Sequence, residues 1–412
     1  MRKGREGSRV RHERRIAIAS VIRQFVWALL VCLLGLVNPR VSLAATPLTY
    51  AGLAYAGNSI NIASRFRYSK RYETRLKSRG ADIDANLREV VKGGRYPLFE
   101  LNTTGNTEIK GDSTLVTTLT VTGETISDET LGPVHKLLVQ IRAQAMIFDF
   151  QSKMLLRAYP LSFAYLDVLN HAPSEADIDE RVAYAYEGAQ GKDGIFARYV
   201  QALSHATLPR NDGLFLQITE VKIGKDAAPA IPEALSQDPS AKAAAADTWL
   251  ADHLDEALNT YAGIPVIPYS AGYAVGNVMQ LQLADSNFSI KFPEPNVTIS
   301  VELTSVKRVP YVQNNVGTSY IYGAFAILKI ATQGSPRSTL DASFKNGEVK
   351  EVPATQAYVD DLPAYNDAIR GLFNKLSDEL GGKDTPWLKS ATASPDIKAQ
   401  LTAARGLLQK CK

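Results

Sequence analysis

The stretch DTWLADHLDEALNTYAGIPVIPYS, residues 247–270, decides how the second half of the chain folds. Its apolar residues recur every three or four positions and lie on one stripe of a helix: Leu250, Leu254, Ala257, Leu258 and Tyr261. Gly263 follows the last of them and is a typical helix terminator. IPVIPYS, 264–270, then predicts a short buried strand. Its two prolines fit strand ends or a sheet edge, because proline donates no ladder hydrogen bond.

The same order of elements occurs earlier in the chain. A helical pattern at 82–94 ends on two glycines and precedes YPLFELN, 96–102, which takes the place of IPVIPYS. Apolar alternation predicts further strands at 48–57, 113–126, 137–150 and 154–166 in the first half, and at 213–224, 278–292, 296–312 and 318–332 in the second. The sequence therefore predicts an α+β fold with two related α/β units, each a strand, a helix and a short strand plus an antiparallel meander.

Further helices separate and follow these units. Ser174 and Asp177 have nearly the spacing of a capping box and predict a helix over 172–188. Apolar stripes predict helices over 358–382 and 394–410. The expected organisation is a signal peptide at 1–44, a first α/β unit at 45–171, a helical spacer at 172–210, a second α/β unit at 211–355 and a helical tail at 356–412.

The first 44 residues have the composition of an export signal. Basic residues precede an uncharged apolar run at 25–37, and Ser42 and Ala44 are small residues placed for a cut after Ala44. Thirteen helical residues span roughly 20 Å, which is short for a membrane crossing. A run starting at Ile16 is longer but buries Arg23, so an uncleaved anchor is the alternative. We expect a periplasmic or secreted protein, after cleavage near Ala44.

Charge and cysteine content narrow the function classes. The full chain carries +4, and residues 1–44 hold nine Lys or Arg and two Glu, a net of +7, so the mature chain carries −3. Its basic pI therefore comes from the leader, and no nucleic-acid partner is expected. Cys411 is the one cysteine after cleavage and forms no internal disulfide; it either pairs between chains or stays an idle, frayed thiol.

Three segments carry a resemblance to a known domain: DTWLADHLDEALNTYAGIPVIPYS, TSYIYGAFAILKIATQG and AQAMIFDFQSKMLLRAYP. Both halves of the chain resemble the periplasmic α/β domain found at the amino terminus of the Tol-system translocation protein and in the curli secretion channel lipoprotein. The resemblance implies an assembly or scaffold role in the envelope. The chain lacks a lipidated cysteine, a propeller repeat and an apolar barrel hairpin, so neither parent activity transfers.

One segment comes close to a catalytic motif. Pro268-Tyr269-Ser270-Ala271-Gly272 is one residue short of the G-x-S-x-G nucleophile elbow, because Pro268 stands where glycine is required. The histidines of the mature chain all precede Ser270, whereas that fold places its histidine after the serine: His135, His171, His205 and His253. We expect Ser270 to end a strand, and a periplasmic serine hydrolase using Ser270 is the alternative.

Cofactor and metal signatures are weak. Gly272 and Gly276 lack the Lys-Ser/Thr of a phosphate loop, so no cofactor is expected. His253 and Glu256 share a helix face, but two ligands do not close a metal site. We therefore expect no metal, and we place His253 and the neighbouring acids Asp252, Asp255 and Glu256 on the solvated face of the 247–263 helix. Asp360-Asp361 is expected in the first turn of the C-terminal helix.

Aromatic and apolar residues suggest where partners bind. Tyrosines cluster in or beside the second meander and suit the recognition of partners or glycans, although tyrosine also tiles half-buried sheet faces. The apolar stripe of the 358–382 helix must be buried either on the second unit or in another chain. The candidate partner-binding residues are Tyr269, Tyr273, Tyr320, Tyr322, Leu372, Phe373 and Leu376.

These observations favour a non-enzymatic exported envelope protein that acts as a scaffold, assembly or binding module in the bacterial periplasm, with envelope proteins as partners. Besides the hydrolase that uses Ser270, the competing class is a cell-wall or glycan-binding protein that uses exposed tyrosines.

Overall fold

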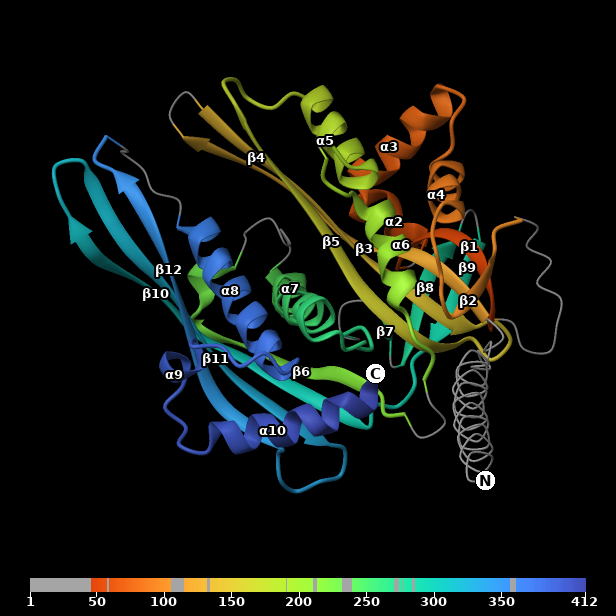
Figure 1. The fold of residues 1–412 in the computed structure, drawn as a ribbon. Helices are drawn as coiled ribbons and strands as arrows, with labels where there is room; N and C mark the ends of the chain where they lie inside the picture. Colours follow the sequence, from red (N-terminus) through yellow and green to blue (C-terminus); the bar gives the residue numbers. More distant parts are fainter. Residues whose placement is uncertain are drawn as a thin grey trace, which may run out of the picture. The chain divides into compact units, whose positions relative to one another are not determined.

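The computed structural model describes residues 46–57, 59–104, 115–131, 134–189, 191–209, 213–231, 239–269, 274–275, 277–283, 286–355 and 361–412. All described residues belong to one compact part of the chain, Ala45–Lys412. That part is a mixed α+β fold with two sheets, as the sequence predicts (Figure 1). None of the helices in these ranges is long and apolar enough to cross a membrane.

The first sheet begins with a parallel core and continues as a meander. Strand β1 (Thr46–Ala56) pairs in parallel with β2 (Phe99–Asn102) on one side and with β3 (Leu115–Leu131) on the other. Strands β4 (Val134–Asp149) and β5 (Met154–Leu169) then extend the sheet antiparallel. The meander alternates polar and apolar residues, which gives the sheet two faces of different chemistry.

The second sheet repeats this plan. Strand β6 (Leu216–Asp226) pairs in parallel with β10 (Val297–Gln313), and β11 (Gly317–Thr332) and β12 (Leu340–Pro353) complete an antiparallel meander. On the other edge of β6, Ile267 forms a parallel bridge with Gln217. The strand predicted at 264–270 is thus reduced to a single bridge, which lies where β2 pairs in the first sheet.

Two register shifts show that the units share one backbone plan. In β1 the shift lies between Tyr50 and Gly52, and in β6 it lies between Ile218 and Glu220. The second shift comes four residues further along the partner strand in each unit, after Val121 in β3 and after Leu303 in β10. Bulges are specific, position-dependent features of a sheet, so their coincidence confirms two related units.

Helices cover one face of each sheet. In the first unit they include α4 (Ile83–Lys92), α5 (Glu175–Glu187) and α6 (Ile195–His205), and in the second α7 (Pro239–Ala257), α8 (Leu362–Leu380), α9 (Leu388–Ala391) and α10 (Ile397–Leu408). Two more helices, α2 (Ser59–Arg65) and α3 (Arg67–Ser78), lie between β1 and α4. Ser174 and Asp177 form the complete capping box of α5. The expected spacer and tail are therefore the helical layers of the two units.

Three strands cross between the units, contrary to prediction. Residues 278–292 were expected in the second meander, but β7 (Ala274–Val275), β8 (Val278–Leu283) and β9 (Ser286–Lys291) join the first sheet. Strand β8 pairs with β1, and β9 meets β5 at Met154–Lys291, so β1, β3, β4, β5, β9 and β8 form a closed ring. The assignment failed because alternation reports which face of a strand is buried and not which sheet contains it.

A glycine in β1 makes the first bulge possible. Gly52 has φ +110°, and a Cβ added there would lie 2.6 Å from Asp84 Oδ1. That oxygen accepts hydrogen bonds of 3.0 Å from the Leu53 amide and from the Tyr50 hydroxyl. Gly52 therefore allows the α4 carboxylate to approach the bulge closely enough to tie the helix to the sheet.

We predict that Gly52→Ala lowers the free energy of unfolding by about 3 kcal/mol, because it adds backbone strain and displaces Asp84. Gly80→Ala is the matched control: Gly80 has φ +73° but nothing within 4 Å of an added Cβ. Its cost is backbone strain alone, about 1 kcal/mol. Denaturant unfolding of both variants measures the difference, and equal losses would show that the Asp84 contact contributes nothing.

Candidate functional site

Helix α7 is enclosed by both sheets. Its apolar stripe packs into the core of the second unit, where Leu250, Leu254 and Leu258 are fully buried. Its other side faces strands β4 and β5 of the first sheet. The helix continues into a π-helical turn at Leu258–Ala262 and ends at Gly263, whose φ of +62° is left-handed. The predicted stop signal is therefore confirmed, and so is the stripe from Leu250 to Leu258, whereas Tyr261, the last predicted member of the stripe, is 37% exposed.

A polar seam joins α7 to the first sheet; we use this name for Arg142, Gln144, Ser162, Asp252 and Glu256. Arg142 Nε lies 3.2 Å from Asp252 Oδ2, an ion pair outside hydrogen-bond geometry. The Ser162 hydroxyl donates to Glu256 Oε1 at 2.5 Å. One turn further, Asn259 Nδ2 donates to the Pro160 carbonyl oxygen at 3.2 Å. Three polar residues of the second unit thus bind one patch of the first.

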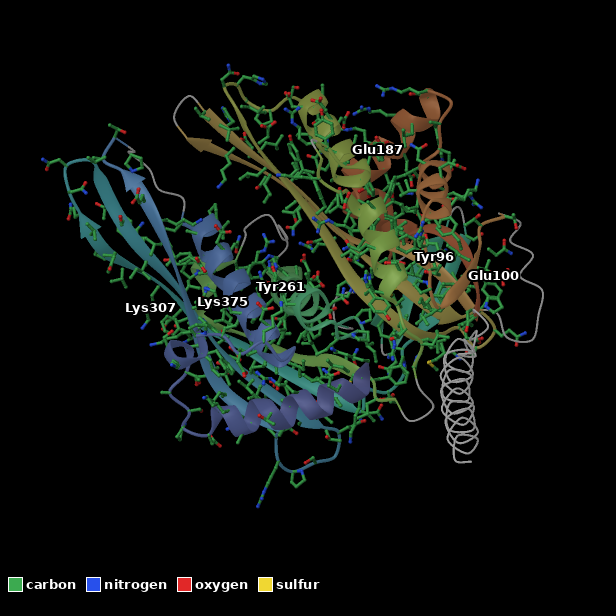
Figure 2. All side chains as sticks on the ribbon, viewed as in Figure 1. Tyr96, Glu100, Glu187, Tyr261, Lys307 and Lys375 are labelled. Atoms are coloured by element: carbon green, nitrogen blue, oxygen red, sulfur yellow. The ribbon has the colours of Figure 1, made fainter. Side chains whose placement is uncertain are left out.

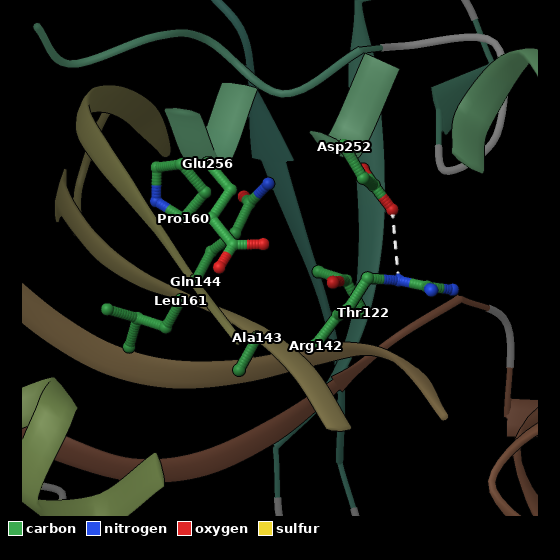
Figure 3. A pocket seen from close by; sticks show the side chains of 8 residues that line it. All are labelled: Thr122, Arg142, Ala143, Gln144, Pro160, Leu161, Asp252 and Glu256. Atoms are coloured by element: carbon green, nitrogen blue, oxygen red, sulfur yellow. Dashed lines mark ion pairs between the residues drawn. The ribbon is translucent and has the colours of Figure 1, made fainter. Parts of the chain in front are cut away.

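The seam contains a small hollow (Figure 3). The centre of a water molecule can occupy about 10 Å³ of it, and Thr122, Pro160 and Leu161 also line it. This is close to the volume that a single water needs and far too small for an organic ligand. Gln144 Oε1 is buried and has no hydrogen-bond partner among the described residues. The hollow therefore suits a bridging water better than a cofactor.

His253 and Asp255 lie inside the protein, which corrects their expected place on a solvated helix face. Their exposed fractions are 8% and 2%. Burial, and then the guanidinium groups of Arg370 and Arg142, lower the pKa of His253 from 6.5 to about 3. Burial, and then Asp252 and Glu256, raise the pKa of Asp255 well above its ordinary value. His253 is therefore neutral at pH 7, and Asp255 keeps its proton to a higher pH than an exposed aspartate does.

The side chains of the polar seam are arranged to hold helix α7 against the first sheet. A serine nucleophile is activated by a hydrogen bond to a base, usually a histidine that a third group orients. Here Ser162 donates to a carboxylate, whereas the His253 ring stacks edge-on against Trp249 with centroids 4.8 Å apart. Across the described ranges, no three His, Cys, Asp or Glu side chains come together as a metal site. The arrangement can position two polypeptide layers and shelter a water.

The tyrosine candidates are mostly structural. Tyr322 is 1% exposed, and its hydroxyl donates a 2.6 Å hydrogen bond to Oδ1 of Asp361, the residue before α8. Tyr269 is also buried, and Tyr320 is partly buried under the Arg308 guanidinium. Tyr273 and Ser270, the weak catalytic candidate, lie outside the described residues. Asp361 was expected in the first turn of the C-terminal helix but is the residue before α8, and its carboxylate binds Arg308 and Tyr322; Asp360 lies outside the described residues.

The apolar stripe of α8 is buried on its own chain. Leu372, Phe373 and Leu376 are each 1% exposed and belong to the core of the second unit. Of the two places that the sequence left open, the structure assigns the second unit's own sheet. Cys411 is buried in the same core, not frayed, and burial raises the pKa of its thiol to about 11.

The structure exposes apolar residues that the sequence did not single out. At the far end of the first meander, Leu166 is 56% exposed and pairs directly with Leu138. At the far end of the second, Val349 is 57% exposed and pairs directly with Ile321. Counted from the bulge in each unit, these two cross-strand pairs occupy the same positions. Only the repeat, followed strand by strand, reveals that they correspond.

Comparisons with known proteins add little to these findings. No family model matches the chain, and no curated protein matches it. A solved structure of Xanthomonas campestris protein XCC0632, described as a DUF330 family member, aligns with 43% of this chain and 89% of its own. Sequence identity is 11% and the TM-score is 0.21, so this match carries no weight for fold or function.

The pKa of His253 predicts a loss of stability in acid. The folded protein keeps the imidazole neutral down to about pH 3, whereas the unfolded chain takes up a proton below about 6.5. The wild type therefore loses a few kcal/mol of unfolding free energy as pH falls from 6.5 to 3. His253→Gln, measured by urea unfolding across that range, should lose less. Parallel curves for the two proteins would contradict the burial argument.

Asp255 predicts the opposite pH dependence. The folded state keeps the proton of Asp255 to a higher pH than the unfolded state, which releases it above about 3.8, so this group destabilises the fold as pH rises. Asp255→Asn should raise the unfolding free energy at pH 7 by at least about 1 kcal/mol, and the gain should vanish near pH 4. Urea unfolding at pH 4 and pH 7 measures the gain, and an Asp255→Asn protein no more stable than the wild type at pH 7 would contradict the prediction.

Proposed function

We propose that this protein is a non-enzymatic, exported module of the bacterial envelope that binds other envelope proteins and holds them as a scaffold. The observation that carries the proposal is the duplicated apolar pair at the far ends of the meanders, Leu138–Leu166 and Ile321–Val349. Exposed apolar clusters on a soluble domain are typical of interaction sites. Two equivalent sites on one chain are suited to holding two partners, or two parts of one partner, together.

Neighbouring residues enlarge both surfaces. Beside Leu166, Val168 is 64% exposed on the same face of β5. In the second meander, Val309 is 52% exposed and pairs with Ile321 from the other side, and Tyr311 is 66% exposed. The strands fix the positions of these side chains before binding, which reduces the entropy lost when a partner is ordered against them. Surfaces of this kind support binding without a reaction.

Export rests on the sequence of the first 44 residues. Their basic, apolar and small-residue segments are typical of a secretory signal. A mature chain of net charge −3 without an internal disulfide must owe its stability to its cores.

A photo-crosslinking amino acid at Leu166 or at Val349 tests the binding role in living cells. We predict discrete adducts with another envelope protein from both positions, because each is the exposed member of its apolar pair. Charge placed beside the probe, Leu138→Glu or Ile321→Glu respectively, should reduce the adduct at least about tenfold. The same probe at exposed Lys398 of α10 is the matched control and should yield no such adduct.

The processed protein should begin at Ala45 and appear in the periplasmic fraction, which amino-terminal sequencing of the same sample checks. A chain that begins at Met1 would overturn export. Absence of adducts from both probes would overturn the binding role.

A further inference from the structure

One face of the second sheet is left uncovered by the described part of the chain. The strand register arranges it in three rows of directly paired residues, which we call the open face: Ser305, Phe325 and Lys345; Lys307, Gly323 and Gly347; Val309, Ile321 and Val349. Lys345 and Val349 are exposed, and Lys307 holds its ammonium 5.4 Å from the centre of the Phe325 ring. Figure 2 shows Lys307 on the side of the sheet away from Lys375 of α8.

The first sheet has the same three rows, and there the first row is covered. Its residues are Gly123, Arg142 and Ser162, followed by Thr125, Gln140 and Ala164, and then by Ser127, Leu138 and Leu166. Helix α7 of the second unit lies on the first row, through Asp252 against Arg142 and Glu256 against Ser162. The repeat therefore shows what covers this face in one unit: the first helix of the next unit.

Helix α4 is the counterpart of α7 in the first unit. Both follow the first strand of their unit and lead into a short parallel strand. Both bury residues four apart: Ile83, Leu87 and Val91 in α4, and Leu250, Leu254 and Leu258 in α7 and its final turn. In this alignment, the α7 residues that bind the first sheet, Asp252, Glu256 and Asn259, correspond to Ala85, Glu89 and Lys92.

These three α4 residues are exposed, and they match the open face in chemistry. Ala85 is exposed, and the side chains of Glu89 and Lys92 are 71% and 48% exposed. The residues of the second sheet that correspond to Arg142, Ser162 and Pro160 are Phe325, Lys345 and Ser343. In this alignment Ala85 corresponds to Asp252 and would face Phe325 in place of Arg142. Glu89 corresponds to Glu256 and would face Lys345 in place of Ser162.

We propose that a second copy of this chain docks its α4 helix on the open face, with Glu89 against Lys345 and Ala85 against Phe325, so that copies associate head to tail. The chain's own α4 is fixed in the first core by its buried residues and covers β1, so the occupant comes from another molecule. Helices α2 and α3 do not obstruct the contact: α3 binds α5 through Arg71 and Asp179 and leaves Ala85 and Glu89 exposed.

Such an interface is heterologous, because it joins two different surfaces, and it therefore builds rings or filaments and not closed pairs. The inference deepens the proposed binding function by naming one partner, a second copy, and it is distinguishable from it. Self-association is measured with purified protein, whereas the binding role is measured by cross-links to other proteins in cells.

Sedimentation velocity of the purified protein over a wide concentration range tests the inference. The wild type should form dimers and larger species as concentration rises. Glu89→Lys and Lys345→Glu should each weaken association about tenfold or more, because each places like charges in contact. The double variant carrying both changes should recover association, since the two charges are exchanged. Both positions are exposed, and thermal unfolding should show that the variants remain folded.

Mixing the two single variants tests the geometry. The lysine introduced by Glu89→Lys can pair with the glutamate introduced by Lys345→Glu, and the native Glu89 of the second variant can pair with the native Lys345 of the first. The mixture should therefore associate with alternating copies, although neither variant does so alone. Association that depends on Lys345 but not on Glu89 would show two open faces packed together, which overturns the proposal. A wild type that stays monomeric up to about 100 μM, or single variants that associate like the wild type, would overturn it as well.

Discussion

Helix α7 is in contact with two sheets at once, and the rest of the structure follows from how it satisfies both. Its apolar stripe is used on the second sheet, so the side that meets the first sheet is polar. Polar groups removed from water need partners, and Arg142 and Ser162 supply them from the first sheet. Such a seam adds less to stability than an apolar contact of the same size, but it accepts only one register between the units.

The exchanged strands make the two units inseparable. Residues 274–291 leave the second unit, pair with β1 and β5, and close the ring of the first sheet before the chain returns to β10. The ring encloses its own apolar cluster, including Ala54, Met146 and Phe292. Opening the seam would therefore also require opening this ring, which explains why Ala45–Lys412 forms one compact unit in spite of its duplicated plan.

The sequence predicts the local elements well, because they depend on neighbouring residues. The stripe from Leu250 to Leu258, the stop at Gly263 and the extended segment that forms a parallel bridge at Ile267 can all be inferred from residue spacing. The capping box at Ser174 is likewise local. The repeat of elements follows from the same patterns, and the structure confirms it.

What depends on distant contacts could not be predicted. His253 and Asp255 have the spacing of a solvated helix face, and they are buried because a second sheet happens to cover that face. The seam had one signal in the sequence: Gln140, Arg142 and Gln144 place polar side chains at alternate positions of an otherwise apolar strand. That pattern marks a face that meets something polar, but it does not identify α7 as the partner.

Duplication also explains why two surfaces are left over. Two units in tandem make one internal contact, in which α7 of the second unit lies on the first sheet. The exposed side of α4 and the open face of the second sheet therefore have no binding surface to contact in the described part of the same chain. Terminal repeats remain soluble when such faces are polar. Next to the Ser305 row of the open face, the sheet is polar, because Lys329 and Asp341 form an ion pair at 3.2 Å. The opposite end of the open face carries Val309, Ile321 and Val349 and is apolar. Lys345 of the open face occupies the position that Ser162, which binds Glu256, has in the first unit. The same lysine therefore keeps the open face polar in the free chain and provides the charge that recognises an acidic helix.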